Sequence, residues 1–541
     1  MKEYKNSKSA IRLPIFIGLA IAFGVLLGAQ MADGTSGAKP ELFKSLNKLK
    51  QVLTYIENDY VDEVDTDVLV EGVIEDMLQE LDPHTVYISQ EEKLLTQSQL
   101  QGNFEGIGIE FNIFKDTIMV VAPLSGGPSE KLGILSGDKI IKVDGETVAG
   151  VGFSNRDVVT RLRGEKGSKV VVSIKRGNQA NLIDFEISRD VIPQYSVDVS
   201  YMVDDKTGYI KVSRFAATTY LEFKEALIRL NEQGMEKLVL DLTGNPGGYM
   251  DRAVDMVDEF LAGEQLIVFT QGKESRYNDS HYSRKDGDFE NGSLVVMIDE
   301  GSASASEIVS GALQDHDRAM IVGRRSYGKG LVQLPISLND GSELRLTISR
   351  YYTPSGRCIQ KPYEDKDAYH REFVSRFENG EIFNEDSIQV NDSLVYKTDK
   401  GRLVYGGGGI VPDVFVPMDT VGNSRYLNRL FTSNTVAEFA FNYADRNRKK
   451  LEKMGLENYI NDFELSEKDL KSLSTQAEKN GVAFEKEQFE KSKNQLALLV
   501  KAHIARGIWD NAGFYPVINQ QNEIFLRALD LFGKADQLAK K

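Results

Sequence analysis

Hydrophobic positions in residues 40–100 recur at the spacing of an α-helix. The stretch DVLVEGVIEDMLQELDPHTVYI repeats this spacing and then reaches Asp82-Pro83, a pair that stops a helix. The positions that share one helix face in the first half of the segment are Leu46, Leu49, Val52, Leu53 and Ile56. The pattern predicts an N-terminal helical region over residues 36–99.

The hydrophobic pattern changes to that of strands from about residue 104. GIGIEFNIF and TIMVVAPL are short apolar runs, KVVVSIKR and LIDFEISR alternate apolar and polar residues, and VDGETV is a turn between strands. SEKLGILSGDKIIKVDG predicts a short helix that leads into a strand. These patterns predict a small, mostly β domain over residues 100–190.

Strands and helices alternate from about residue 200 to residue 360, which is typical of an α/β fold. KLVLDL (237–242), SLVVMI (293–298) and AMIVG (319–323) are strands of the buried type, and DRAVDMVDEFL and residues 306–314 are helices. GSASASEI directly follows the second of these strands. It is therefore a strand-to-helix junction in an α/β core, where ligands and catalytic groups tend to lie.

The predicted fold class is an α/β core with a mixed sheet and flanking helices, a mostly β domain, and helical N- and C-terminal regions. The core spans residues 191–418, and its charged residues 361–405 predict an irregular insertion or flap. Residues 419–541 are helical and highly charged, and they include the amphipathic segment NEIFLRALDLF.

The N-terminus has the form of an export signal, with a basic flank before the apolar residues 13–32. The run nearly matches the ~20 residues that span a bilayer. Small residues are missing at the candidate cleavage sites, so we expect residues 1–35 to form an uncleaved anchor and linker. This predicts an inner-membrane protein with its catalytic body in the periplasm. The alternatives are a signal peptide removed on export to the periplasm and a buried core helix.

Composition narrows the function classes. The 541 residues are too many for one core, so three or four structural units are expected. The net charge of -16 would repel polyphosphate, which excludes nucleic acid as a partner. The single cysteine, Cys358, excludes an internal disulfide and a cysteine-based zinc site. No partners lie at metal-ligand spacing from His84, so a turn histidine is the preferred interpretation there.

The serines of GSASASEI are candidate nucleophiles, but a serine hydroxyl needs a base to remove its proton. His316 lies about three helical turns beyond Ser304, too far to reach it. His281 or His370 could act across space. Lys329, in RRSYGKGLVQ, is a further candidate if burial or a neighbouring cation lowers its pKa; the alternative is a solvated loop lysine.

SASASEIVSGALQDHDRAMIVGRRSYGKGLVQ closely resembles the carboxyl-terminal processing (tail-specific) serine peptidases. LVLDLTGNPGG before it, and ISRYYTPSGRCIQ and GIVPDV after it, carry the same resemblance. YVDEVDTDVL…MLQELDPHTVYI resembles the N-terminal helical part of that family, and residues 104–190 resemble its PDZ domain. The similarity covers about residues 40–418, with the motifs in matching order.

The resemblance implies a serine endopeptidase that works through an acyl-enzyme intermediate with no metal or cofactor. Ser304 is then the nucleophile, Lys329 the general base, and Gln333 the group that orients the lysine. The backbone amides of Gly248 and Ala305 are expected to form the oxyanion hole, since Ala305 opens a helix and glycine permits close approach. Ser302 and Ser306 are left as packing or capping residues. Thr243, where the family usually has arginine, and Cys358, often serine, are departures that remove no catalytic group.

FEGIGIEF resembles the carboxylate-binding loop of a PDZ domain. The N–H groups of Gly106, Ile107, Gly108 and Ile109 would hold the C-terminal carboxylate of a protein substrate, and the peptide would add as a strand. We therefore expect processing or degradation of proteins from their C-termini. The alternative is a catalytically silent PDZ-containing scaffold that binds peptides. For residues 419–541 a dimerisation element, an adaptor-docking site and a packed cap all remain open.

Overall fold

The computed structural model describes residues 40–540 except 115, 125, 136, 178, 180 and 285. The chain divides into two compact units, one that ends at Glu80 and one that begins at Leu81. The first contains helices α2 (Pro40–Asp59) and α3 (Thr66–Gln79), as the helical spacing predicts. The anchor expected in residues 1–35 lies outside the described residues. Among the helices of the described part, none is both long and apolar enough to cross a membrane.

The second unit opens with β1 (Val86–Ile88), α4 (Gln90–Gln101) and β2 (Asn103–Gly106), and β2 pairs with β9 (Asp190–Pro193). An antiparallel sheet follows in the order β3 (Ile109–Phe114), β4 (Thr117–Pro123), β5 (Lys139–Val143), β7 (Lys169–Lys175) and β8 (Ile183–Ser188), with β6 (Glu146–Thr147) beside β5. Helices α5 (Pro128–Lys131) and α6 (Asn155–Leu162) complete this small domain. The apolar run GIGIEFNIF is not one strand, because the chain bends at Gly108 (φ +72°) between β2 and β3. The strand β3 lies at the edge of the sheet, because among the described strands it pairs only with β4.

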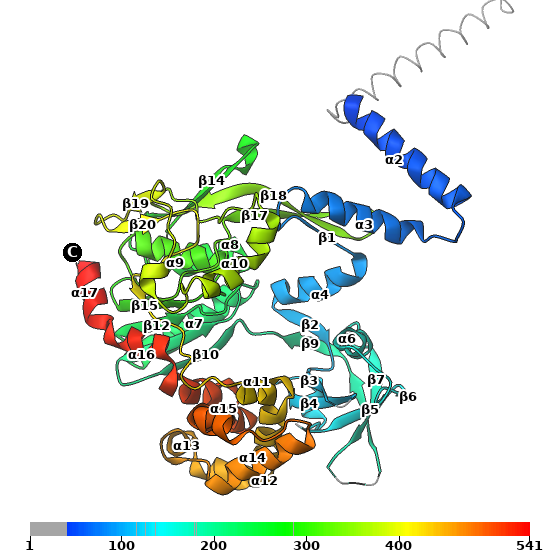
Figure 1. Cartoon of the computed structure of the whole chain (residues 1–541). Helices are drawn as coiled ribbons and strands as arrows, with labels where there is room; N and C mark the ends of the chain where they lie inside the picture. Colours follow the sequence, from blue (N-terminus) through cyan, green and yellow to red (C-terminus); the bar gives the residue numbers. More distant parts are fainter. Residues whose placement is uncertain are drawn as a thin grey trace, which may run out of the picture. The chain divides into compact units, whose positions relative to one another are not determined.

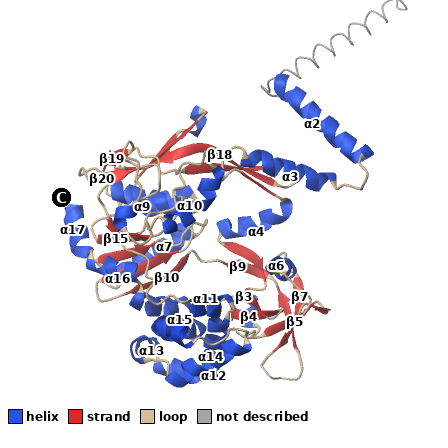
Figure 2. Cartoon of the chain, viewed as in Figure 1, coloured by secondary structure: helices blue, strands red, loops and turns tan. Residues whose placement is uncertain are grey.

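The α/β core is built on a six-stranded mixed sheet (Figures 1 and 2). Its strand order is β10 (Val197–Met202), β11 (Thr207–Val212), β12 (Lys237–Asp241), β15 (Ser293–Ile298), β16 (Met320–Gly323) and β21 (Val414–Phe415). The strands are parallel except β10, which runs antiparallel to β11.

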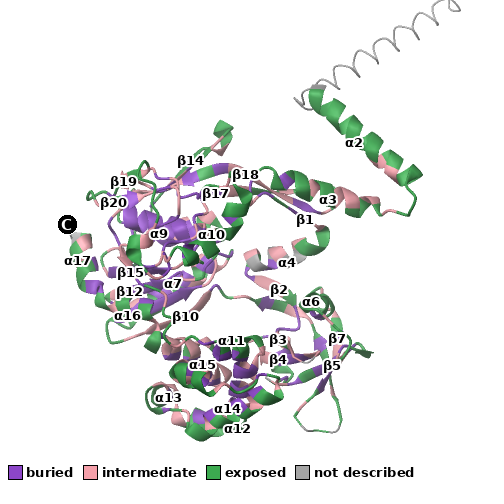
Figure 3. Cartoon of the chain, in the orientation of Figure 1, coloured by how far each residue is buried: buried purple, intermediate pink, exposed green. Residues whose placement is uncertain are grey.

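Both faces of this sheet are covered, and alternate residues of each strand face opposite layers. Leu240 and Val296 pack with α7 (Thr219–Glu232), α8 (Met250–Asp258) and α9 (Ala305–Asp315). Val239 and Val295 pack instead with α16 (Glu523–Asp530) and α17 (Phe532–Lys540). The helix α9 is buried along its whole length (Figure 3).

The loop that follows β16 leads into a second sheet. Its order is β1, β18 (Glu343–Tyr352), β13 (Leu266–Gly272) and β14 (Asp279–Tyr282), and β17 (Leu331–Ser337) also pairs with β18. The expectation of an irregular flap at residues 361–405 is partly wrong, because it contains helix α10 (Lys366–Glu378) and the hairpin β19 (Val395–Lys397) and β20 (Leu403–Tyr405). Asp365 caps α10 and buried Arg376 donates to the carbonyls of Arg325 and Ser326, so the helix is held on the core.

Residues from 425 onward are helical, as predicted. The helices α11 (Arg425–Thr432), α12 (Thr435–Met454), α13 (Leu456–Asp462), α14 (Glu467–Lys479) and the long α15 (Lys486–Ile518) share one apolar core. The backbone of α15 leaves helical geometry at Trp509 and Asp510, and the chain then continues into α16 and α17.

Candidate active site

Ser304 lies at the point where β15 turns into α9, immediately before the first helical residue Ala305. Its backbone has φ 55° and ψ −113°, a conformation rare for a residue with a Cβ. Strain of this kind costs about 1–3 kcal/mol and persists only where the surroundings enforce it, commonly at functional sites. The backbone therefore singles out the middle serine of the three.

The two flanking serines are used structurally. The hydroxyl of Ser302 donates to the carbonyl of Leu242 (2.8 Å), and the hydroxyl of Ser306 donates to the carbonyl of Asn245 (3.0 Å). Both side chains are fully buried. They fasten the start of α9 to the turn after β12, which leaves Ser304 as the serine open to a ligand.

The turn TGNPGG lies directly against Ser304. Its buried Asn245 accepts from the amide of Ala303 (2.9 Å) and donates to the carbonyl of Val212 (3.0 Å), which fixes the turn between β11 and α9. A Cβ placed on Gly247 would lie 2.7 Å from Ser304 Cβ and 2.9 Å from Ala305 N. Only glycine allows the two segments to come this close.

The backbone amides of Gly248 and Ala305 face no protein acceptor in the described part of the chain. Ala305 N–H belongs to the first turn of α9, where amides lack intrahelical partners and the helix dipole is positive. Two unsatisfied donors beside one strained serine are the arrangement that a developing oxyanion needs.

Lys329, in the loop that follows β16, lines the same pocket as Ser304. Its Nζ donates to Gln333 Oε1 at 3.1 Å. Burial lowers the pKa of Lys329, and the nearby Arg345 guanidinium lowers it further, whereas Glu307 and Asp82 raise it. The balance is downward, so the amine gives up its proton more readily than a solvated lysine does.

Ser304, Lys329, Gln333 and Gly248 all line one pocket of about 470 Å³. No hydrogen bond joins Ser304 Oγ to Lys329 Nζ in this conformation, in which the lysine is bonded to Gln333. Catalytic hydrogen bonds are often long before substrate binds. None of the five histidines lines this pocket: His281 lies on β14 and His370 on α10.

Comparison with known proteins agrees with this geometry. The model of peptidase family S41 matches residues 206–368, a PDZ domain matches 106–187, and the N-terminal domain of the activating protease CtpB matches 27–92. The carboxy-terminal-processing protease of Bartonella bacilliformis is 36% identical over 357 residues, which cover 65% of this chain and 80% of that protein. This chain belongs to the carboxy-terminal processing proteases of family S41.

Two further similarities accompany the family assignment. CtpB of Bacillus subtilis is 35% identical over 333 residues, covering 60% of this chain and 68% of that protein. The solved photosystem II D1 C-terminal processing protease is 25% identical, with a TM-score of 0.36, and covers 69% of this chain and 87% of that one. A family of unknown function matches residues 426–510 of this S41 protease.

His84 takes part in the site of this S41 protease, which the sequence did not reveal. Its carbonyl oxygen accepts a hydrogen bond from Gln333 Nε2, so the amide of Gln333 must present its oxygen to Lys329. The His84 ring forms a hydrogen bond through Nε2 with the Tyr369 hydroxyl, at 2.7 Å. Burial lowers the pKa of His84 to about 4, with a further contribution from Lys329, so the ring is neutral at pH 7. The turn histidine thus sets the orientation of the group beside the lysine through its backbone.

Glu307 is the second residue that the sequence analysis missed. Its buried carboxylate accepts from the amides of Ser304 (2.7 Å), Gly328 (2.7 Å) and Lys329 (2.9 Å) and from the Ser326 hydroxyl (2.5 Å). Burial raises the pKa of Glu307, while these four donors lower it. One side chain therefore ties the loop of Ser304 to the loop of Lys329. The Ser-x-x-Glu spacing from Ser304 was a visible capping signal that could have pointed to it.

The ammonium group of Lys211 lies at the turn residue Thr243, the position where the family usually has arginine. Lys211, from the neighbouring strand β11, donates to the carbonyl and hydroxyl oxygens of Thr243 and to Asp241 Oδ1. Its side chain is only 9% exposed. The turn at Thr243 is thus held by an ammonium group from another strand of the same sheet.

The predicted PDZ loop is buried at all four residues, Gly106, Ile107, Gly108 and Ile109. Gly106 ends β2, Ile107 and Gly108 connect the strands, and Ile109 begins the edge strand β3. The amide of Gly108 donates to no protein acceptor in the described residues, whereas the segment around Gly106 and Ile107 bridges to Arg163. Ile107, Gly108 and Ile109 line a different pocket from Ser304.

Proposed function

We propose that this S41 protease is a serine endopeptidase that cleaves proteins captured by their C-termini, with Ser304 as nucleophile and Lys329 as general base. The observation that carries the proposal is a single pocket lined by a strained serine, by Gly248 with its unsatisfied amide and by a buried lysine with a lowered pKa; the unsatisfied Ala305 amide directly follows the serine.

In the first half of the reaction, the neutral Lys329 amine accepts the proton of Ser304 Oγ as that oxygen attacks the scissile carbonyl carbon. The resulting oxyanion accepts hydrogen bonds from Gly248 N–H and Ala305 N–H. The Lys329 ammonium then gives its proton to the leaving amine, the C–N bond breaks, and an ester of Ser304 remains.

In the second half, Lys329 takes a proton from water as the water oxygen attacks the ester. The collapse of this intermediate returns the proton to Ser304 Oγ and releases the new carboxylate. Gln333, held by the His84 carbonyl, keeps the lysine amine at the pocket through both halves. The chemistry proposed here requires no metal or cofactor.

Substrate capture is proposed at the PDZ loop. The free amide of Gly108 suits a terminal carboxylate, and the unpaired edge of β3 suits an added peptide strand. The substrate class is therefore polypeptide with an accessible C-terminus.

The test is cleavage of an unstructured protein that ends in small apolar residues, by the full chain and its Ser304→Ala and Lys329→Ala variants. We expect loss of cleavage in both variants, with unchanged folding by circular dichroism. His281→Ala and His370→Ala are the controls and should cleave at the rate of the unchanged chain. Cleavage by Lys329→Ala near that rate would refute the lysine base, and peptide binding without any cleavage would instead favour a silent PDZ scaffold.

We also propose that residues 1–35 place the catalytic body in the periplasm, because a basic flank precedes their apolar run. Protease added to intact spheroplasts should digest the body while cytoplasmic marker proteins survive. Protection of the body under these conditions would refute this location.

A further inference from the structure

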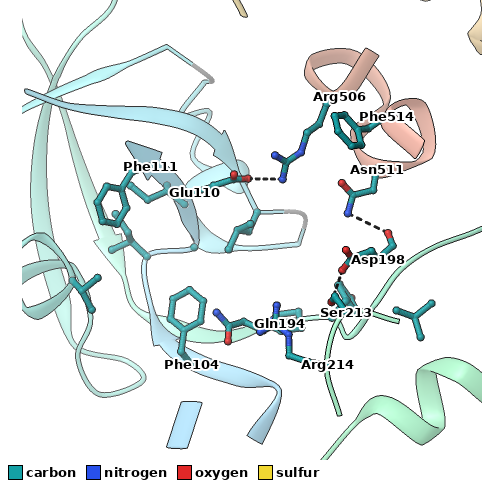
Figure 4. Close-up of a pocket in the computed structure, with 18 of the residues that line it drawn as sticks. Phe104, Glu110, Phe111, Gln194, Asp198, Ser213, Arg214, Arg506, Asn511 and Phe514 are labelled. Atoms are coloured by element: carbon teal, nitrogen blue, oxygen red, sulfur yellow. Dashed lines mark hydrogen bonds and ion pairs between the residues drawn. The ribbon is translucent and has the colours of Figure 1, made fainter. Parts of the chain in front are cut away.

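A pocket of about 740 Å³ opens at the PDZ loop and has three walls (Figure 4). The first wall is the PDZ domain, with β3 and α6. The second is the peptidase core, which contributes Asp198 and Arg214. The third is α15 of the C-terminal helical region, residues 419–541, which contributes Arg506, Asn511 and Phe514. A peptide that adds to β3 enters a space that the C-terminal region helps to enclose.

The α15 wall is fastened to the peptidase sheet. Tyr515 donates its hydroxyl proton to Asp198 Oδ2 (2.7 Å), and Asn511 Nδ2 donates to the Asp198 carbonyl (3.2 Å). The break in α15 at Trp509 and Asp510 lies between Arg506 and Asn511, and residues on both sides of it line the pocket. The wall is thus a fixed part of the enzyme body.

Arg506 reaches from this wall to the PDZ edge strand. Its Nη2 lies 3.2 Å from Glu110 Oε2, and the two side chains are 40% and 39% exposed. A guanidinium has five N–H donors, and this pair occupies one of them. The remaining donors face a peptide beside β3, and Glu110 and Asp510 are the acidic groups that share the charge of Arg506.

The register of an added strand places substrate side chains near Arg506. Glu110 comes one residue after the loop 106–109, and a peptide strand lies about 4.8 Å from its neighbour and rises about 3.4 Å per residue. With the carboxylate held by the loop, the substrate residues opposite Glu110 are within about three of the C-terminus.

We propose that the C-terminal helical region forms the outer wall of the substrate-peptide site, and that Arg506 selects the charge of the substrate residues just upstream of the C-terminus. The inference rests on the proposed function, since it needs the carboxylate at the PDZ loop. It assigns a role to a region whose matching family has no known function.

The experiment measures peptide affinity by fluorescence anisotropy on the full chain carrying Ser304→Ala, which prevents cleavage. Two labelled peptides with the same small apolar end carry either Asp or Lys at the third residue from the free carboxylate. Arg506→Glu should shift the ratio of the two affinities toward the Lys peptide by at least about five-fold, because the facing charge is reversed. Arg506→Gln should shift it in the same direction by less.

The matched control is Arg446→Glu on α12, an exposed arginine that does not line the pocket. It should leave the ratio unchanged. An unchanged ratio in Arg506→Glu, with the free-carboxylate peptides still binding more tightly than amidated ones, would overturn the role of the wall and leave C-terminal capture intact. Equal binding of free and amidated peptides to the parent chain would overturn the capture itself, and the inference with it.

Discussion

In the proposed mechanism, the protonation state of Lys329 decides whether this chain can cleave peptides at neutral pH. Burial is the largest cause of the downward shift in the Lys329 pKa, and Arg345 adds to it. A solvated lysine would hold its proton at pH 7 and could not accept another. At the scale of single residues, the fold lowers the Lys329 pKa by two means that the sequence cannot show: burial of the amine away from water and a neighbouring positive charge.

The first prediction concerns pH. In the proposed mechanism the neutral amine is the active form, so kcat/KM should rise with pH through the Lys329 pKa, with its midpoint below the ordinary value of 10.5. Arg345→Gln removes a cation that disfavours the protonated amine, so it should move this midpoint to higher pH. Initial rates across a pH series measure both effects. A midpoint that moves to lower pH in Arg345→Gln would contradict the assignment.

The second prediction concerns Glu307. Glu307→Gln replaces one of two acceptor oxygens by a donor, so two of the four donors lose their partner and the free energy of unfolding should fall by at least about 2 kcal/mol. Since the two catalytic loops are then untied, kcat should fall as well.

Glu259→Gln is the control for this variant. The carboxylate of Glu259 is as buried as that of Glu307, and it accepts hydrogen bonds from the Tyr220 hydroxyl, the Lys224 ammonium and the Asp288 amide. It does not line the Ser304 pocket. Denaturant titration and kcat should show lost stability in both variants and lost turnover only in Glu307→Gln. Equal turnover in the two would contradict the positioning role.

At the scale of elements, the candidate active site is a junction of three loops that follow neighbouring strands. The turn after β12, the start of α9 after β15 and the Lys329 loop after β16 meet at the same end of the parallel sheet. The close approach of the first two depends on Gly247, whose φ is +96°.

The third prediction tests this approach. Gly247→Ala would place a methyl group 2.7 Å from Ser304 Cβ, so kcat/KM should fall by at least about 100-fold, the scale of a lost oxyanion donor. Gly263→Ala has a similar backbone strain (φ +72°) with no atom near the new methyl group. It should lose about 1–2 kcal/mol of stability and keep its activity. Equal activity in the two variants would contradict the account.

Sequence patterns anticipated the elements better than the contacts between them. Alternation and helical spacing located β12, β15 and α9 to within a few residues, because each buries its own apolar face. They could not show that the His84 carbonyl meets Gln333 or that Lys211 meets Thr243, because these contacts join residues far apart in the chain. The prediction of an irregular flap failed for the same reason. Arg376 anchors α10 on carbonyls of the core, and the composition of residues 361–405 does not reveal these contacts.

At the scale of the whole molecule, the last two helices are part of the peptidase core. Ile524, Phe525, Leu531 and Phe532 are buried on the sheet face opposite α9. At about 1.5–3 kcal/mol for each side chain, their burial contributes about 6–12 kcal/mol, which is comparable to the stability of a whole domain. Of the roles left open for residues 419–541, a packed cap is correct for this end of the region.

The fourth prediction follows from this packing. Phe525→Ala should lower the free energy of unfolding by about 3–5 kcal/mol, because it empties a buried aromatic site. Leu526→Ala, on the same helix but 44% exposed, should change it by less than about 1 kcal/mol. Guanidinium titration compares the two, and equal losses would show that α16 does not pack as described.

The proposed reaction passes through a covalent ester on Ser304, which mass spectrometry after acid quenching can detect directly. The full chain is mixed with an ester-activated peptide and quenched within the first turnover, and its digest is searched for the acyl group. We predict the acyl mass on the peptide that contains Ser304, a slower appearance in Lys329→Ala, and no adduct in Ser304→Ala. Steady turnover with no adduct on Ser304, or with the adduct on another residue, would contradict the account.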